Sequence, residues 1–144
     1  SELPPDLQLP AGFKAPRFVQ PGILAIEGPA FDPGQPSKEM NELVRQLERY
    51  DWTKVPMIVI CDDSQFLTET LNNFLWASFT RANPSHDIYG VGSSVIHKHW
   101  GCTGPLVIDA RIKPHHAPPL ITDKAVSQRV DRLFSKGGEL YGIL

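Results

Sequence analysis

Two adjacent carboxylates, Asp62 and Asp63, directly follow an apolar run that extends from Met57 to Cys61. A continuous apolar run rich in β-branched residues is typical of a strand buried on both faces in a parallel sheet. Open α/β sheets bind ligands at the carboxyl ends of such strands, which makes Asp62 and Asp63 candidates for a ligand crevice. Asp63 or Ser64 could instead cap the following helix, because a side-chain oxygen there accepts a hydrogen bond from a free N–H of the first turn.

Imidazole and thiol side chains are concentrated in two predicted loops, at His97, His99, Cys102, His115 and His116. Both groups are preferred zinc ligands, but their spacing matches no established zinc motif. A nucleophilic Cys102 thiolate would need a base and a third, orienting group, and the sequence indicates no such group. We therefore predict neither metal ligands nor catalytic residues for this chain.

Three basic residues, Arg81, Arg111 and Lys113, are possible contacts for an anion or for a partner protein. Arg111 and Lys113 share one face of a segment from Leu106 to Lys113, whose alternation is typical of a half-covered strand. An anionic ligand or a partner's carboxylates could bind there, or a cross-strand ladder of ion pairs with Asp109 could explain the pattern. Arg81 ends a predicted helix, where its charge complements the helix dipole.

The length of 144 residues and the hydrophobic content of 41% suit one compact domain. A formal charge of -2 indicates no nucleic-acid partner and no anionic membrane partner. We find neither an apolar stretch that could span a membrane nor a signal peptide at the start. We therefore expect a cytoplasmic protein in which Cys61 and Cys102 are reduced thiols.

Residues 1–21 contain five prolines and predict an extended or irregular N-terminal arm. Apolar runs predict strands at 22–27 and 55–61, and alternation predicts a strand at 106–113, with shorter extended segments at 87–90 and 94–97. Helices are predicted after Ser37, over 65–80, and after Thr122 or Asp123. This order predicts a mainly parallel mixed sheet flanked by helices, in one α/β domain over residues 22–144 with a C-terminal helix.

The helix over 65–80 is expected to pack an apolar face against the sheet. The residues of that face are Phe66, Leu67, Leu71, Phe74, Leu75 and Phe79. Helical spacing explains Phe74 and Trp76 as core residues or as anchors of a subunit interface rather than as a substrate clamp.

One run of residues resembles a known family. It consists of an apolar strand ending in Asp62-Asp63, then a helix with Asn73 to Ala77 that closes on Thr80-Arg81, and then Pro84 and Asp87-Ile88. The resemblance is to the C-terminal region of the UbiD family of prenylated-flavin-dependent decarboxylases and reversible carboxylases. Leu106 to Arg111 is similar to the family's hydrophobic-Ile-Asp-Ala strand. The resemblance covers roughly residues 22 to 135.

The resemblance implies an α/β domain that packs against a split-barrel domain and builds dimers or larger assemblies. It places prenylated FMN, with a divalent metal and potassium, mainly on the split barrel, and the proton-handling residues upstream. The family often has a cofactor-contacting lysine just ahead of the acidic strand, where this chain has Val55 or Pro56. The nearest candidate is Lys54. The stretch Asp62 to Phe66 also lacks the third acidic residue that is common in the family.

Three functions are consistent with these observations. The first is an assembly or cofactor-domain-covering module, or a small subunit, of a UbiD-like aromatic acid (de)carboxylase. Such a chain would be inactive alone, and its partners would be a flavin-binding split barrel and further copies of itself. The second is a freestanding, self-associating binding or scaffold domain without catalysis. The third is a small metal-dependent hydrolase that uses the histidine loops.

Overall fold

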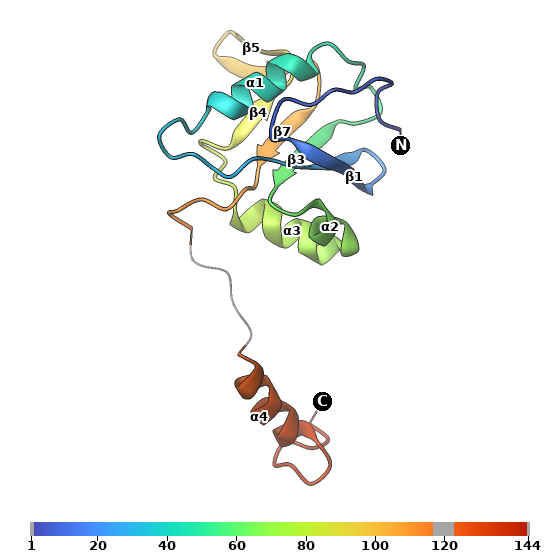
Figure 1. Cartoon of the computed structure of the whole chain (residues 1–144), viewed down its shortest axis with the longest axis vertical. Coiled ribbons are helices and arrows are strands. Elements are labelled where there is room, and N and C mark those ends of the chain that lie inside the picture. The colour runs from blue at the N-terminus through green and yellow to red at the C-terminus, as the bar shows by residue number, and fades with distance from the viewer. Residues whose placement is uncertain (1, 117–122, 144) are drawn as a thin grey trace.

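The computed structural model describes residues 2–116 and 123–143, and its centre is a mixed sheet of five strands in the order β1-β2-β3-β7-β4 (Figure 1). These strands are β1 (Lys14–Gln20), β2 (Ile23–Glu27), β3 (Met57–Cys61), β7 (Leu106–Asp109) and β4 (Ile88–Gly90). The central strands β2, β3 and β7 are parallel, and β1 and β4 pair antiparallel at the two edges. The predicted α/β class and mixed sheet are confirmed, with the parallel pairing at the centre of the sheet.

Helices cover both faces of the sheet. Figure 1 shows α1 (Lys38–Leu47) on one side, and α2 (Ser64–Glu69) and α3 (Leu71–Thr80) on the other. Along β3, Ile58 and Ile60 belong to the apolar cluster that includes α1 residues, whereas Val59 and Cys61 belong to the cluster that includes α2 and α3 residues. Successive side chains of a strand point to opposite faces, so a strand covered on both sides is apolar throughout.

α1 presents the apolar face that its sequence predicts. Met40, Leu43 and Leu47 are fully buried, at the spacing of one helical face. Ser37 occupies the N-cap position, as expected, but its side chain makes no capping hydrogen bond.

The single helix predicted over 65–80 is wrong, because Thr70 divides it into α2 and α3. Thr70 is extended, with φ -146° and ψ 152°, and its side chain accepts a hydrogen bond from Asn73 N as the N-cap of α3. The break changes which side chains reach the sheet. Leu67 and Phe74 are buried as expected, but Leu71, Leu75 and Phe79 are exposed.

Part of the N-terminal arm forms an edge strand. β1 pairs with β2 after a turn at Pro21-Gly22, in which Gly22 has a φ of +87°. Pro16 lies within β1, beside a register irregularity between Lys14 and Arg17. An edge strand tolerates proline because its outer N–H groups have no partner strand.

The prediction of a half-covered strand over 106–113 is wrong in its second half. β7 ends at Asp109, and the following Arg111 and Lys113 are buried while Ile112 is exposed. The two charged side chains are buried because carboxylates from distant segments pair with them.

A two-stranded hairpin and the C-terminal helix complete the described structure. β5 (Ser93–Ile96) and β6 (His99–Cys102) form a hairpin whose turn, His97-Lys98, has positive φ at both residues. α4 (Lys124–Phe134) confirms the predicted C-terminal helix, and Asp123 caps it by accepting hydrogen bonds from Ala125 N and Val126 N. The alternative cap, Thr122, lies outside the described residues. None of the helices described combines the length and the apolar character needed to cross a membrane.

Candidate functional site

Charged side chains gather at the carboxyl edge of the parallel strands, around Arg111. The Arg111 guanidinium donates hydrogen bonds from Nε and Nη2 to the two carboxylate oxygens of Asp109, and both distances are 2.9 Å. Its Nη1 donates to Glu39 Oε2 on α1 at 2.7 Å and to the Pro29 carbonyl at 2.9 Å. Burial opposes the charge of Arg111, but the hydrogen bonds to Asp109 and Glu39 outweigh burial and raise its pKa.

Lys113 is the second buried cation of this edge. Its Nζ donates to three main-chain carbonyls, those of Asp109 at 2.8 Å, Arg81 at 3.2 Å and Arg111 at 3.3 Å. The same nitrogen lies 3.5 Å from Asp87 Oδ2, and that oxygen also accepts a hydrogen bond from Asn83 N. We call the set Glu39, Asp87, Asp109, Arg111 and Lys113 the Asp109 network.

The Asp109 network joins parts of the chain that are far apart in sequence. Arg111 and Glu39 are 72 positions apart, and the Phe31 ring lies 5.7 Å from Arg111 Cζ and 5.6 Å from Lys113 Nζ. The donors of both cations point at the protein's own oxygens rather than at an open surface. In this structure the network therefore holds α1, β7 and the segment before α1 together.

The two acidic residues at the end of β3 have separate roles. Asp63 is the N-cap of α2, since its Oδ1 accepts a hydrogen bond from Phe66 N at 3.0 Å, and the capping hypothesis is confirmed for this residue. Asp62 Oδ2 accepts hydrogen bonds from Ile112 N at 2.9 Å and from Arg81 Nη1 at 3.2 Å. The Arg81 guanidinium also lies over the Trp76 ring, 4.8 Å from its centroid.

Sequence reasoning missed Glu27, Phe31, Glu39 and Asp87 at this edge. Glu27, the last residue of β2, accepts hydrogen bonds from the backbone N and the side-chain Oγ of Ser64, both at 3.1 Å. Position at a strand end could have indicated Glu27, because the ends of parallel neighbours meet at one edge. No local pattern indicates the other three residues.

Lys54 lies before the start of β3, whereas Asp62 and Asp63 lie after its end, so they are at opposite ends of this strand. Lys54 is exposed in the turn before β3. A single small ligand therefore cannot contact all three side chains unless it spans the length of β3.

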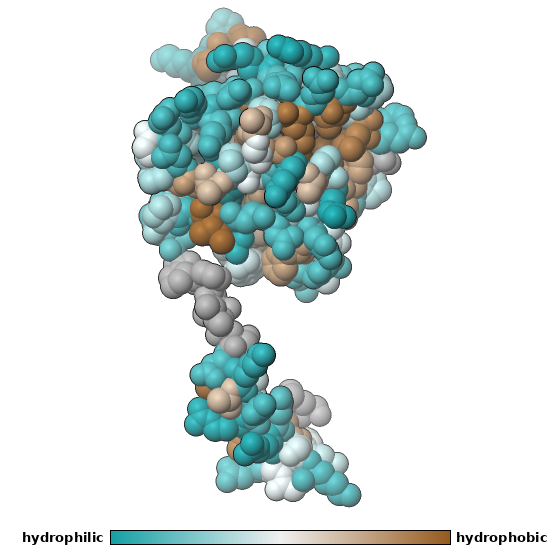
Figure 2. All heavy atoms as spheres, viewed as in Figure 1, coloured by the Kyte–Doolittle hydropathy of each residue, from teal (hydrophilic) through white to brown (hydrophobic). Residues whose placement is uncertain are grey.

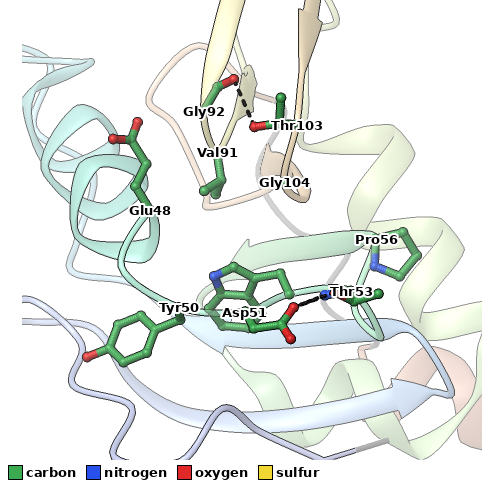
Figure 3. A pocket seen from close by; sticks show the side chains of 10 residues that line it. Glu48, Tyr50, Asp51, Thr53, Pro56, Val91, Gly92, Thr103 and Gly104 are labelled. Carbon is green, nitrogen blue, oxygen red and sulfur yellow. Dashed lines mark hydrogen bonds between the residues drawn. The ribbon is translucent and has the colours of Figure 1, made fainter.

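A cleft of about 670 Å³ opens beside the base of the β5–β6 hairpin (Figure 3). It lies at the end of the sheet where the parallel strands begin, which we call the amino edge. Its lining is Glu48, Tyr50, Asp51, Trp52, Thr53, Pro56, Val91, Gly92, Thr103 and Gly104. Hydrogen bonds from the side chain and backbone of Thr53 lower the pKa of Asp51, which favours its anionic form. Because this described lining includes two acids and no basic side chain, the cleft is unsuited to a phosphate group.

The histidine loops form no metal site in the part of the chain that the structure describes. His97 lies in the exposed hairpin turn, and the rings of His115 and His116 are 4.6 Å apart. Burial, followed by the charge of Lys113, lowers the pKa of His116. Over residues 2–116 and 123–143, no group of three or more His, Cys, Asp or Glu side chains is arranged to hold a metal.

The two cysteines are expected to differ in reactivity. Cys61 is fully buried, and burial is the main reason that the pKa of its thiol is raised to about 12. Cys102 is partly exposed at the end of β6.

At about pH 8 we expect the folded protein to react with a disulfide reagent at Cys102 and not at Cys61, since the thiolate is the nucleophile. Titration with Ellman's reagent before and after unfolding, in the wild type and in Cys102→Ser, measures this. Rapid reaction of folded Cys102→Ser would contradict it.

Exposed apolar side chains include groups on α3, on the β5–β6 hairpin and on α4. α3 exposes Leu71, Leu75, Trp76 and Phe79, which we call the α3 patch. The hairpin exposes Val95, Ile96 and Trp100, and α4 exposes Val126, Val130 and Leu133. Figure 2 shows a mostly hydrophilic surface interrupted by separate hydrophobic patches. Contiguous exposed apolar patches mark sites of interaction with other proteins or with ligands.

Comparison with known proteins finds partial similarity to chlamydial proteins. One of them, from Chlamydia pneumoniae, is named as a subunit of 4-hydroxybenzoate decarboxylase, and the chain is 29% identical to it over 84 residues, 58% of this chain and 14% of that protein. The chain is 34% identical over 85 residues to an uncharacterized protein of Chlamydia muridarum, covering 56% of this chain and 14% of the relative. An uncharacterized protein of Chlamydia caviae is 26% identical over 90 residues, 62% of this chain and 16% of the relative. No family model matches the sequence.

The matches are thus distant and local. The chain spans only about a seventh of the length of these relatives. They relate part of an α/β domain to a segment of much longer proteins, one of which is named as a decarboxylase subunit.

Proposed function

We propose that this chain is an assembly or cofactor-domain-covering module, or a small subunit, of a UbiD-like aromatic acid (de)carboxylase. The observation that carries the proposal is the similarity to a protein named as a subunit of 4-hydroxybenzoate decarboxylase. The strand-and-helix signature from Asp62 to Asp87 supports the same relationship, since it resembles the C-terminal region of that family.

The chemistry of the described side chains supports a role in assembly rather than in catalysis. Arg111 and Lys113 are buried and their nitrogens are directed to internal oxygens, while Asp62 binds Arg81 and a backbone N–H. A general acid or base must reach the proton that it transfers, and the buried nitrogens of Arg111 and Lys113 face internal oxygens instead of an open site. The exposed apolar patches supply surfaces on which other domains or subunits could pack.

The lining of the cleft at the amino edge does not suit prenylated FMN. A flavin phosphate needs basic side chains or a set of free backbone N–H groups, whereas the cleft at the amino edge includes Glu48 and Asp51. Lys54 is not among the described residues that line this cleft. In our proposal a split-barrel domain or subunit therefore holds the flavin together with its divalent metal and potassium.

Reconstitution tests the proposed function. The flavin-binding split-barrel polypeptide from the same source, supplied with prenylated FMN, is assayed for decarboxylation of 4-hydroxybenzoate with and without this chain. We expect carbon dioxide release to require both polypeptides. This chain alone with the cofactor is the control and is expected to be inactive. Equal activity of the split-barrel polypeptide without this chain would refute the proposal.

A further inference from the structure

We propose that α4 packs antiparallel on the α3 patch of its own chain, so that two exposed apolar rows cover each other. This inference concerns the chain alone and does not depend on the proposed function. In the structure none of the residues of α4 is buried, and Figure 1 shows this helix away from the sheet. The α3 patch is likewise open, with Phe79 77% exposed.

α4 needs a partner surface to remain helical. It comprises 11 residues, and isolated helices shorter than about 12–15 residues are marginal in water. Most helical stability in proteins comes from packing an apolar face. The apolar face of α4 is the exposed row Val126, Val130 and Leu133, whose spacing places the three side chains on one side of the helix. Covering this row would therefore stabilise the helix itself.

The α3 patch matches this row in length. Leu71, Leu75 and Phe79 are spaced by four residues, which places them in one row along α3, with Trp76 beside it. At 1.5 Å per residue the α3 row is about 12 Å long and the α4 row is about 10 Å long. Each row can therefore cover the other from end to end.

The path of the chain brings α4 to the carboxyl end of α3. Lys113 Nζ donates a hydrogen bond to the Arg81 carbonyl at 3.2 Å, which holds this segment beside the residue that ends α3. Seven residue steps separate His116 from Asp123, and a chain of that length reaches at most about 25 Å. α4 can therefore begin within reach of the end of α3.

An antiparallel direction follows from this starting point. α4 then runs back along α3, with Val126 beside Phe79 and Val130 beside Leu75. In a parallel pair the connection would first have to pass along the whole of α3, which is about 15 Å long.

The charges around the two rows suit the antiparallel direction. Glu69 is exposed just before α3, at the end that Arg132 and Lys136 of the α4 segment would approach. Arg129 lies beside the α4 row, where its stem can cover apolar surface while the guanidinium remains in water. The pair therefore brings opposite charges together and buries no unpaired charge.

The connection within one chain selects α4 as the occupant of the patch. Two surfaces joined by a short linker meet at an effective concentration on the order of 1 mM. This is about a hundred times the concentration of a second chain in a solution at about 10 μM. A partner that uses the α3 patch would therefore have to displace α4.

Disulfide trapping in the full chain tests the contact. Leu75→Cys and Val130→Cys are combined with Cys102→Ser, and Cys61 is expected to stay reduced because it is fully buried. Mild oxidation at about 10 μM protein, far below the effective concentration of the connected helix, is expected to join the two new thiols within one chain. Mass spectrometry and a non-reducing gel measure the rate and distinguish this product from a disulfide between chains.

The matched control moves one cysteine to the other side of α4. Leu75→Cys with Gln128→Cys, again in Cys102→Ser, places the second thiol opposite the apolar row. A disulfide requires Cα atoms within about 7 Å, so this pair is expected to oxidise at least about tenfold more slowly.

Hydrogen exchange gives an independent measurement. Leu75→Glu alters α3 only, yet it is expected to speed exchange of the α4 amides by at least about tenfold, the effect of losing the burial of one leucine. Val95→Glu changes another exposed apolar side chain, on the hairpin, and is expected to leave exchange in α4 unchanged.

Three results would overturn the inference: equal oxidation rates in the two cysteine pairs, disulfides that form only between chains, or exchange in α4 that Leu75→Glu does not alter. Disulfides between chains would assign the α3 patch to a second copy. None of these measurements uses the reconstitution assay, so the inference and the proposed function fail separately.

Discussion

Replacing Asp109 with asparagine is expected to lower the free energy of unfolding by about 3–5 kcal/mol, the cost of removing one partner of a buried charge pair. Asp109 is 1% exposed, and its carboxylate accepts two side-chain hydrogen bonds from Arg111. Asparagine keeps the shape of the side chain, but it removes the charge that compensates Arg111 and Lys113 in the interior. Urea denaturation at neutral pH, followed by circular dichroism, measures the loss.

An exposed ion pair provides the control for Asp109→Asn. Lys14 lies 3.9 Å from Glu27, but its side chain is 74% exposed. Lys14→Gln is therefore expected to change the free energy of unfolding by less than about 0.5 kcal/mol, because water screens such a pair. A loss below about 1 kcal/mol in Asp109→Asn, typical of an exposed pair, would contradict the structure.

A second replacement separates the charge from the contact. Once Asp109 is neutral, Arg111 is a buried cation with Glu39 as its remaining carboxylate partner. Arg111→Met added to Asp109→Asn is therefore expected to cost less than the sum of the two single losses, because residues in one network are coupled. Additive losses would show that the two side chains do not depend on each other.

Replacing Gly28 with alanine is expected to lower the free energy of unfolding by about 1–3 kcal/mol, the usual cost of overpacking a core. A Cβ at this position would lie 2.6 Å from Ile60 Cγ2 and 2.8 Å from Arg111 Cδ. Ile60 lies in the central strand, and the Arg111 guanidinium is anchored at both Asp109 and Glu39, so neither neighbour can move freely. Thermal and urea denaturation measure the effect.

Gly101 is the matched control for Gly28. A Cβ at Gly101 would meet no atom within 4 Å, and its φ is not positive. Gly101→Ala is therefore expected to change the free energy of unfolding by no more than about 0.5 kcal/mol. Equal stability of the two variants would refute the close packing around Gly28.

Local patterns were sufficient to predict much of the fold. The β-branched run at 57–61 and the face of Met40, Leu43 and Leu47 both appear as expected, because burial imposes a period of two on strands and of 3.6 on helices. Caps are equally local, and Asp63 and Asp123 accept hydrogen bonds from amides only two or three residues ahead.

The exposed face of α3 could not be predicted from the same patterns. Leu71, Leu75 and Phe79 have the spacing of a buried face, which is why the sequence predicts that they contact the sheet. The helix breaks at Thr70 instead, where the backbone is extended and the side chain accepts the hydrogen bond from Asn73 N that caps a new helix. Threonine occurs within helices as well as at caps, so the residue type alone does not indicate the break.

By itself, the sequence determined the α/β class, the central strands and the helix that begins after Ser37. It also narrowed two helix caps to Asp63 or Ser64 and to Thr122 or Asp123, because capping depends on residues within a few positions. Only the tertiary structure decided that Arg111 and Lys113 are buried and that the α3 patch is exposed. A buried charge needs carboxylates such as Glu39, 72 positions from Arg111. The exposure of a helix face depends on how the whole helix lies on the sheet, and neither condition has a signature in local sequence.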